Sequence, residues 1–172
     1  MTIILGIDPG LNTTGYGVIR CDGAAMRLCE AGVVRTRAKD SMESRLAELH
    51  EGIAEIIAAH HPDRMAIEQL FSHYERVRTA ILMGHARGVI CLAAGQAKIP
   101  VTSYQPTRIK KTLTGSGRAA KAQMQLAVKL QLKLTALPEP HDVADALAVA
   151  ICSHHLERFG PIQNQDQNRL IG

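Results

Sequence analysis

The apolar residues of this chain change their spacing near residue 40, and this change limits the folds open to it. Before that point, apolar and β-branched residues form short runs, which predicts strands over residues 2–8, 16–20 and 26–36. The segments between these runs, 9–15 and 21–24, are short and have the composition of turns. Three strands joined by short turns form an antiparallel meander.

After residue 40 the apolar residues recur every three or four positions, which is typical of helices. Ser41 can cap a helix that runs to about residue 60, ahead of Pro62. Further helices are expected over 79–97, 106–115, 119–134 and 142–159, with strands over 64–68 and 101–104. We therefore predict an α/β fold with a mixed five-stranded sheet, in which the antiparallel meander adjoins parallel strands and helices flank both.

Length and composition place the chain among soluble globular proteins. A chain of 172 residues, 46 % of them apolar, suits one domain, here expected over residues 1–158 with a flexible polar tail over 159–172. No CxxC pair occurs, so zinc is not expected, and the four cysteines are expected to be buried free thiols of a reducing compartment. No signal peptide or membrane span is expected, and the predicted location is the cytoplasm.

The charges are distributed unevenly. Between Arg76 and Pro138 the chain has eleven basic residues and no acidic one, so the rest of the chain carries all 16 acidic residues. A block of one sign in a globular protein indicates a polyanionic partner, and a solvated basic face without a partner is the alternative.

Four carboxylates stand where a sheet and a helix can bring them together. Asp8 and Glu68 end two predicted strands. If these strands are parallel neighbours, both carboxylates emerge at the same carboxyl edge of the sheet. Asp142 and Asp145 share one face at the start of an otherwise apolar helix. Converging carboxylates repel one another, and oxygen ligands of this kind suit Mg²⁺ or Mn²⁺, two of which form a clamp for phosphodiester cleavage.

Each of these residues also has a simpler interpretation. Asp8, before a Pro-Gly pair, can be a turn former, and Asp142 can be a helix cap. Glu68 is harder to explain in this way, because a carboxylate that closes an aliphatic strand is costly unless its charge is satisfied.

Four segments of the chain resemble one known family. They are GIDPGLNTTGYGVI (6–19), AIEQLF (66–71), GHARGV (84–89) and HDVADALAVA (141–150). In this order and spacing they are similar to the RuvC-type crossover-junction endodeoxyribonucleases, the bacterial Holliday-junction resolvases. The likeness covers about residues 2–155.

The resemblance implies an RNase H-like fold and a Mg²⁺-dependent homodimer, with two ions in each subunit that Mn²⁺ can replace. Asp8, Glu68, Asp142 and Asp145 would be its catalytic and metal-binding residues. The implied activity is the resolution of Holliday junctions, in recombination and DNA repair, by paired symmetric nicks that leave 5′-phosphate and 3′-hydroxyl ends. The implied partners are a four-way DNA junction and the RuvA and RuvB branch-migration proteins.

The resemblance also implies residues that bind DNA. An aromatic residue that packs against junction bases corresponds to Phe71, although a core position is its alternative. Two lysines near the DNA backbone correspond to Lys110 and Lys121. From the basic block we add four further candidates for DNA binding, which are Arg76, Arg78, Lys111 and Arg118. His141 is a possible accessory group at the scissile phosphate, or a plain surface residue.

The helix over 79–97 has a row of small residues, Ala80, Gly84 and Gly88, that would permit close approach to a second subunit or to the sheet of its own subunit. Three other functions were weighed. An actin-like ATPase needs a second phosphate-loop domain, which this length does not allow. A related nuclease acting on RNA is disfavoured by AIEQLF and the basic block, and a non-catalytic junction-binding protein by the presence of all four carboxylates.

Overall fold

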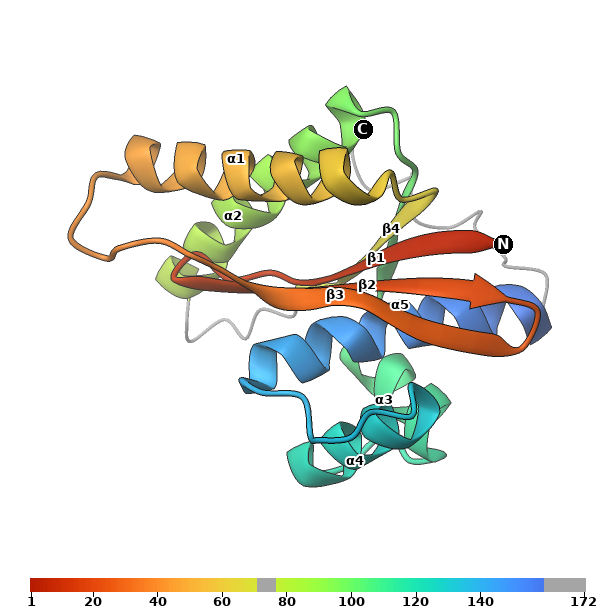
Figure 1. Cartoon of the computed structure of the whole chain (residues 1–172). Coiled ribbons are helices and arrows are strands. Elements are labelled where there is room, and N and C mark those ends of the chain that lie inside the picture. The colour runs from red at the N-terminus through yellow and green to blue at the C-terminus, as the bar shows by residue number, and fades with distance from the viewer. Residues whose placement is uncertain (71–76, 160–172) are drawn as a thin grey trace, which may run out of the picture.

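A computed structural model describes residues 1–70 and 77–159 of the chain. Three strands are followed by helices that alternate with two more strands (Figure 1). The strands are β1 (Thr2–Asp8), β2 (Thr13–Asp22), β3 (Ala25–Arg35), β4 (Arg64–Glu68) and β5 (Val101–Tyr104). The helices are α1 (Met42–His60), α2 (Val77–Gln96), α3 (Pro106–Thr114), α4 (Lys121–Gln131) and α5 (His141–Phe159).

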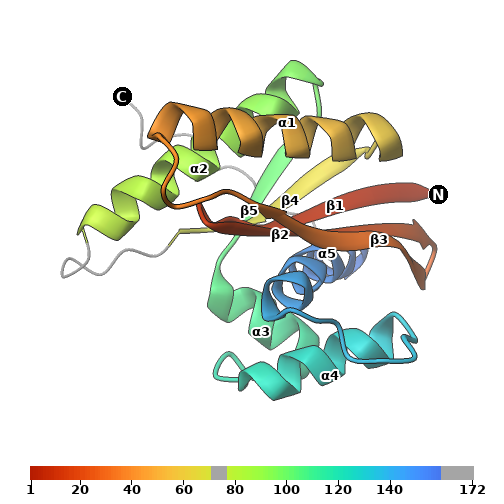
Figure 2. The ribbon, with the colours of Figure 1, turned by 60° about the vertical axis from the view of Figure 1, so that its left-hand side comes forward.

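The five strands form one sheet in the order β3-β2-β1-β4-β5. The pairs β1–β2 and β2–β3 are antiparallel, whereas β1–β4 and β4–β5 are parallel, so the predicted mixed sheet is confirmed. Helices α1 and α2 cover one face of the sheet, and α5 lies on the other face with α3 and α4 packed beyond it (Figures 1 and 2).

Alternate residues of the central strands enter two separate apolar clusters, because successive side chains of a strand point to opposite faces. Leu5, Ile7 and Ile67 belong to the cluster beneath α1 and α2. Ile4 and Ala66 belong to the cluster around α5. Even-numbered positions of β1 and β4 therefore face α5, and this parity also applies to the residues at the two strand ends.

Helix α5 lies directly on the sheet because glycines in β1 and β2 remove the side chains that would stand between them. A Cβ atom built on Gly6 would lie 2.2 Å from the carbonyl oxygen of Ala146, and one built on Gly15 would lie 2.0 Å from that of Asp142. Neither position accommodates a larger residue unless the helix moves. These glycines thus set the height of α5 above the strands.

Helix α2 is only partly covered by the rest of the protein. Its inner side, with Ala86, Ile90 and Ala93 buried, contributes to the cluster beneath α1. Among the described residues it is the one helix that is long and apolar enough to cross a membrane, with a mean hydropathy of 1.3. This is weak evidence for a span, because core helices of soluble proteins meet the same criterion.

Several local predictions need correction. β2 is longer than expected and begins at Thr13, because it is hydrogen-bonded to β1 and β3 on both sides. α4 ends at Gln131 rather than near residue 134. All four cysteines are free, but Cys29 is exposed because it lies on the edge strand β3, and Cys91 is half-buried. The tail expected after residue 158 lies outside the described residues, apart from Phe159.

Candidate functional site

Asp8 and Glu68 end adjacent parallel strands. Ile7 of β1 is in register with Ile67 of β4, so the next residue of each strand is a carboxylate at the same edge of the sheet. Both residues occupy even positions, which places them on the α5 face beyond Gly6 and Ala66. The structure therefore brings these two predicted site residues together, as the parallel arrangement requires.

The start of α5 adds the other two carboxylates to this edge. Asp8 pairs with Gly15 across the antiparallel β1–β2 ladder, and the Asp142 backbone lies over the open side of Gly15. Asp142 is in the first turn of α5 and Asp145 follows one turn later. Because α5 begins at His141, Asp142 does not take the N-cap position that was its alternative interpretation.

The electrostatics show that the charges of the other three carboxylates all act on Asp8. Burial, followed by the charges of Glu68, Asp145 and Asp142, raises the pKa of Asp8 to about 8. Burial and the charge of Asp145 raise the pKa of Glu68 to about 7. Burial, with the charge of Asp142, also raises the pKa of Asp145. The site therefore holds more negative charge than it can ionise at low cost near neutral pH.

The loop that follows Asp8 is held by a buried arginine from α1. Arg45 donates from Nη2 to Asn12 Oδ1 at 2.5 Å and from Nε to Thr36 Oγ1 at 3.1 Å. The Thr36 hydroxyl in turn donates to the carbonyl oxygen of Leu11. These bonds fix the turn between Asp8 and β2. Sequence reasoning missed Arg45, because nothing local distinguishes it from a solvated helix arginine.

A second arginine holds the end of β4. Arg87 of α2 donates from Nη1 to the carbonyl oxygen of Glu68 at 2.8 Å and from Nη2 to Ser103 Oγ at 2.6 Å. The next residue, Gln69, donates its backbone N–H to the carbonyl oxygen of Tyr104 at 2.8 Å. Arg87 lies in the GHARGV segment, which carried a family resemblance but no assigned role.

Two of the predicted basic residues lie near the carboxylates. Lys110 of α3 and Lys121 at the start of α4 both act on this site through charge, since Lys121 lowers the pKa of Asp8 and Lys110 lowers that of Glu68. His141 acts on Asp145 against the overall rise of its pKa, so this residue is near the site although its side chain is exposed.

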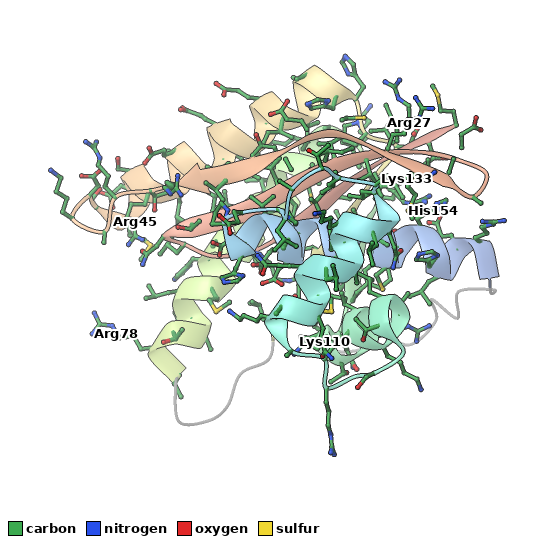
Figure 3. All side chains as sticks on the ribbon, turned by 60° about the horizontal axis from the view of Figure 1, so that its bottom comes forward. Arg27, Arg45, Arg78, Lys110, Lys133 and His154 are labelled. Carbon is green, nitrogen blue, oxygen red and sulfur yellow. The ribbon has the colours of Figure 1, made fainter. Side chains whose placement is uncertain are left out.

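The remaining basic candidates are farther out. Lys111 of α3 and Arg118 of the α3–α4 connection are exposed on the α5 side of the sheet. Arg78 extends from the exposed start of α2, well separated from Lys110 (Figure 3). Phe71 and Arg76 lie outside the described residues, so the structure gives no position for either.

The fit to a divalent cation rests on chemistry and charge. In residues 1–70 and 77–159, no three Asp, Glu, His or Cys side chains stand close enough together to hold a metal ion as they lie. The donors that converge are carboxylate oxygens, however, and the raised pKa values of Asp8 and Glu68 show that Lys110 and Lys121 do not fully compensate the burial and mutual repulsion of these groups. An oxygen-preferring cation such as Mg²⁺ fits both properties.

Comparison with known proteins gives a consistent result. The family model described as crossover junction endodeoxyribonuclease RuvC matches residues 4–154. The RuvC protein of Rhodopirellula baltica is 62 % identical over 153 residues, which is 89 % of this chain and 86 % of that protein. The RuvC protein of Desulforamulus reducens is 47 % identical over 150 residues, covering 87 % and 91 %.

Solved structures agree with the sequence relatives. RuvC from T. thermophilus, in complex with a Holliday junction substrate, has a TM-score of 0.87 at 33 % identity and covers 92 % of this chain and 96 % of that one. A yeast mitochondrial Holliday junction resolvase, at 13 % identity, has a TM-score of 0.58 over 89 % and 84 % and shares the fold alone. The fold is RNase H-like, as expected, and this chain belongs to the RuvC family of crossover junction endodeoxyribonucleases.

Proposed function

We propose that this protein resolves Holliday junctions by Mg²⁺-dependent hydrolysis, with paired symmetric nicks that leave 5′-phosphate and 3′-hydroxyl ends, during recombination and DNA repair. The observation that supports this most is the meeting of Asp8, Glu68, Asp142 and Asp145 at one sheet edge, where burial and the neighbouring carboxylates raise the pKa values of Asp8, Glu68 and Asp145. The RuvC relative solved with a Holliday junction supports the choice of substrate.

Asp8, Glu68, Asp142 and Asp145 would hold two Mg²⁺ ions, which Mn²⁺ could replace. Cations held there would supply Lewis-acid chemistry, which would lower the pKa of a water nucleophile and offset the charge on the leaving oxygen. Lys110 and Lys121 place positive charge beside the carboxylates, where a scissile phosphate would enter. The exposed imidazole of His141 is available to contact that phosphate or to donate a proton.

Affinity for the junction would come mainly from phosphate contacts, since Lys and Arg contacts to the backbone dominate DNA binding. Lys111, Arg118, Arg76 and Arg78 are proposed to extend the contacts of Lys110 and Lys121 along the DNA arms. Phe71, three residues after Glu68, is proposed to wedge between bases at an opened crossover. If so, the cleavage defect of Phe71→Ala will shrink on a junction with unpaired bases at the crossover, and an equal defect on both substrates would contradict the wedge.

The enzyme is proposed to act as a homodimer through α2. The outer side of this helix carries an exposed stripe of Val77, Ile81, Gly84, Gly88 and Leu92 (the α2 stripe). Val77, Ile81 and Leu92 are each more than half exposed, and a Cβ built on Gly84 or Gly88 would meet nothing within 4 Å. A two-fold axis at this stripe would bury it and give two sites for nicks on opposed strands.

The start of α2 projects beyond the sheet (Figure 2), and within the described residues the α2 stripe is exposed. Ala80, at the start of the row of small residues expected to permit this contact, is half-buried, whereas Gly84 and Gly88 face outward. RuvA and RuvB are proposed as the branch-migration partners, the protein is proposed to act in the cytoplasm, and its nuclease domain is proposed to end near residue 158.

A substrate comparison tests this function. The purified protein is incubated with Mg²⁺ and a four-way DNA junction, a linear duplex of the same sequence or an RNA–DNA hybrid. We expect symmetric nicks in the junction, religatable by DNA ligase because of their 5′-phosphate and 3′-hydroxyl ends, and little cleavage of the duplex or the hybrid. Preferential cleavage of the hybrid would instead favour the related RNA-directed activity.

A further inference from the structure

We propose that Arg87 is a positioning residue that makes the placement of Glu68 depend on helix α2, an inference that rests on the proposed function of Glu68. The guanidinium contacts the backbone of Glu68 rather than its carboxylate. Nη1 bonds to the carbonyl oxygen of Glu68 at 2.8 Å, and Nη2 bonds to Ser103 Oγ at 2.6 Å. One side chain thereby joins three elements, α2, β4 and β5, at the point where β4 ends.

This contact lies at the end of β4, where the pairing of β4 with β1 stops. β4 ends at Glu68, and its register with β1 is complete at Ile67. Beyond Glu68 the backbone keeps one ladder-like bond, from the Gln69 N–H to the Tyr104 carbonyl oxygen. The Glu68 carbonyl is therefore fixed by a side chain from α2, and the direction of its carboxylate follows from that fixed peptide.

The contact of Arg87 depends on geometry rather than on paired charges. Both hydrogen-bond acceptors of the Arg87 guanidinium are neutral, and within the described residues no carboxylate forms an ion pair with it. The side chain is half-buried, so its charge is partly withdrawn from water without an acidic partner. The planar guanidinium presents two N–H donors in a fixed fork, which two differently placed acceptors require and a lysine ammonium does not reproduce.

The location of Arg87 on α2 gives the contact a functional meaning. Its chain neighbour Gly88 belongs to the outward-facing α2 stripe, whereas Ala86 is buried against the core. Arg87 thus lies on the flank of α2, between the exposed face and the buried face of the helix. A shift of α2 would move the Glu68 peptide through Arg87. The Mg²⁺ affinity of the site would therefore depend on the position of α2 against the sheet.

The experiment compares the full-length parent with Arg87→Gln and Arg87→Lys. Arg27→Gln serves as a matched control, because Arg27 is exposed on β3 and lies far from Arg78 and the start of α2 (Figure 3). For each protein, the Mg²⁺ concentration that gives half of the Mg²⁺-induced rise in melting temperature is measured. Single-turnover cleavage of the junction and its dissociation constant in Ca²⁺ are measured alongside.

For Arg87→Gln we expect the half-saturating Mg²⁺ concentration to rise and cleavage to fall by about tenfold or more, as for other residues that orient a metal ligand. The junction dissociation constant should stay at the parent value, since Arg87 is turned toward Glu68 and Ser103 and not toward DNA. Arg87→Lys should lie between parent and Arg87→Gln, and Arg27→Gln should match the parent.

A parent protein that does not cleave the junction would remove the proposed function itself, whatever the variants do. If the parent cleaves and both Arg87 variants retain the parent's Mg²⁺ half-saturation, the positioning role is wrong, even where cleavage falls with the folded fraction. Arg87→Lys keeps the charge and most of the packing. If Arg87→Gln does not fold, the half-saturating Mg²⁺ concentration of Arg87→Lys tests the positioning role, and a value equal to the parent's contradicts it.

Discussion

Asp8 and Glu68 leave the sheet from neighbouring parallel strands, one residue beyond the matched pair Ile7 and Ile67, and both face α5. After burial, the charge of Glu68 is the largest cause of the raised pKa of Asp8. The sheet thus forces two carboxylates together that would separate in water. Such an arrangement is stable at neutral pH if protons or a cation neutralise it, so protons and a cation compete for the same oxygens.

The first prediction concerns the four carboxylates. Changing any of Asp8, Glu68, Asp142 or Asp145 to its amide should abolish junction cleavage and leave junction binding intact or tighter, since loss of negative charge favours the approach of a polyanion. Cleavage is measured in Mg²⁺ and binding in Ca²⁺. Native-rate cleavage by Asp145→Asn would remove that residue from the catalytic set.

The second prediction concerns pH without metal. Folded pKa values of about 8 for Asp8 and about 7 for Glu68 exceed the unfolded values, so the folded state binds more protons between about pH 4 and pH 8. The stability contributed by their protonated forms is present below pH 4 and is lost as pH rises toward 8. In EDTA, the melting temperature should therefore fall over this window.

Asp8→Asn should flatten that pH dependence and raise the melting temperature at pH 8, because it removes the buried charge. Asp22→Asn, an exposed aspartate on the β2–β3 hairpin, is the control and should behave as the parent. Mg²⁺ should raise the parent's melting temperature more at pH 8 than at pH 6, since protons compete for the same oxygens. A metal-free parent that melts at one temperature across the window would contradict the raised pKa values.

The third prediction concerns the position of α5 on the sheet. A methyl group at residue 15 would lie 2.0 Å from the Asp142 carbonyl oxygen, so Gly15→Ala should displace the start of α5. We expect a loss of stability of about 1–3 kcal/mol, typical of overpacking, and a larger fractional loss of cleavage than of folded protein. Urea unfolding and single-turnover cleavage measure the two effects.

Gly95→Ala is the matched control for Gly15→Ala, because its Cβ would meet nothing within 4 Å in α2. It should leave cleavage unchanged and stabilise the helix by up to about 1 kcal/mol, the difference in helix propensity between glycine and alanine. Full cleavage by a folded Gly15→Ala protein would mean that cleavage does not depend on the exact position of α5 on the sheet.

The fourth prediction concerns Lys110 and Lys121. If each contacts a phosphate, its change to alanine should lower the slope of log affinity against log salt by about 0.9. Lys98→Asn is the control, because Lys98 is exposed just before β5, at the sheet edge opposite the carboxylates, and its positive φ of 58° suits asparagine. Slopes equal to the parent's would show that these lysines do not meet phosphate in the bound state.

The fifth prediction concerns the α2 stripe. Ile81 belongs to this stripe and is 56 % exposed, and Ile81→Glu would place a charge on a two-fold interface. Sedimentation should show a monomer, and the junction should receive single rather than paired nicks. Leu126→Glu, which alters a 51 % exposed leucine of α4, should remain dimeric. A dimeric Ile81→Glu protein would place the interface elsewhere.

Much of the fold could be predicted because it depends on local patterns. The spacing of apolar residues located most helices and strands, and Ser41 and His60 bound α1 as expected. The pairing of Asp8 with Glu68 followed from one assumption, that their strands are parallel neighbours, which the register confirms. The burial of Cys29 was predicted wrongly, because whether a strand lies at the edge of a sheet depends on pairing over the whole chain.

What the sequence determined by itself was the set of carboxylates, the strands and helices that carry them, and the basic block around Lys110 and Lys121, since these follow from residue type and spacing. Only the tertiary structure decided which glycines bring α5 onto the sheet, that Arg45 holds the turn after β1 and that Arg87 holds the end of β4. These contacts join residues far apart in the chain. Their partners are backbone atoms, amides and hydroxyls that every segment offers, so only the folded geometry selects among them.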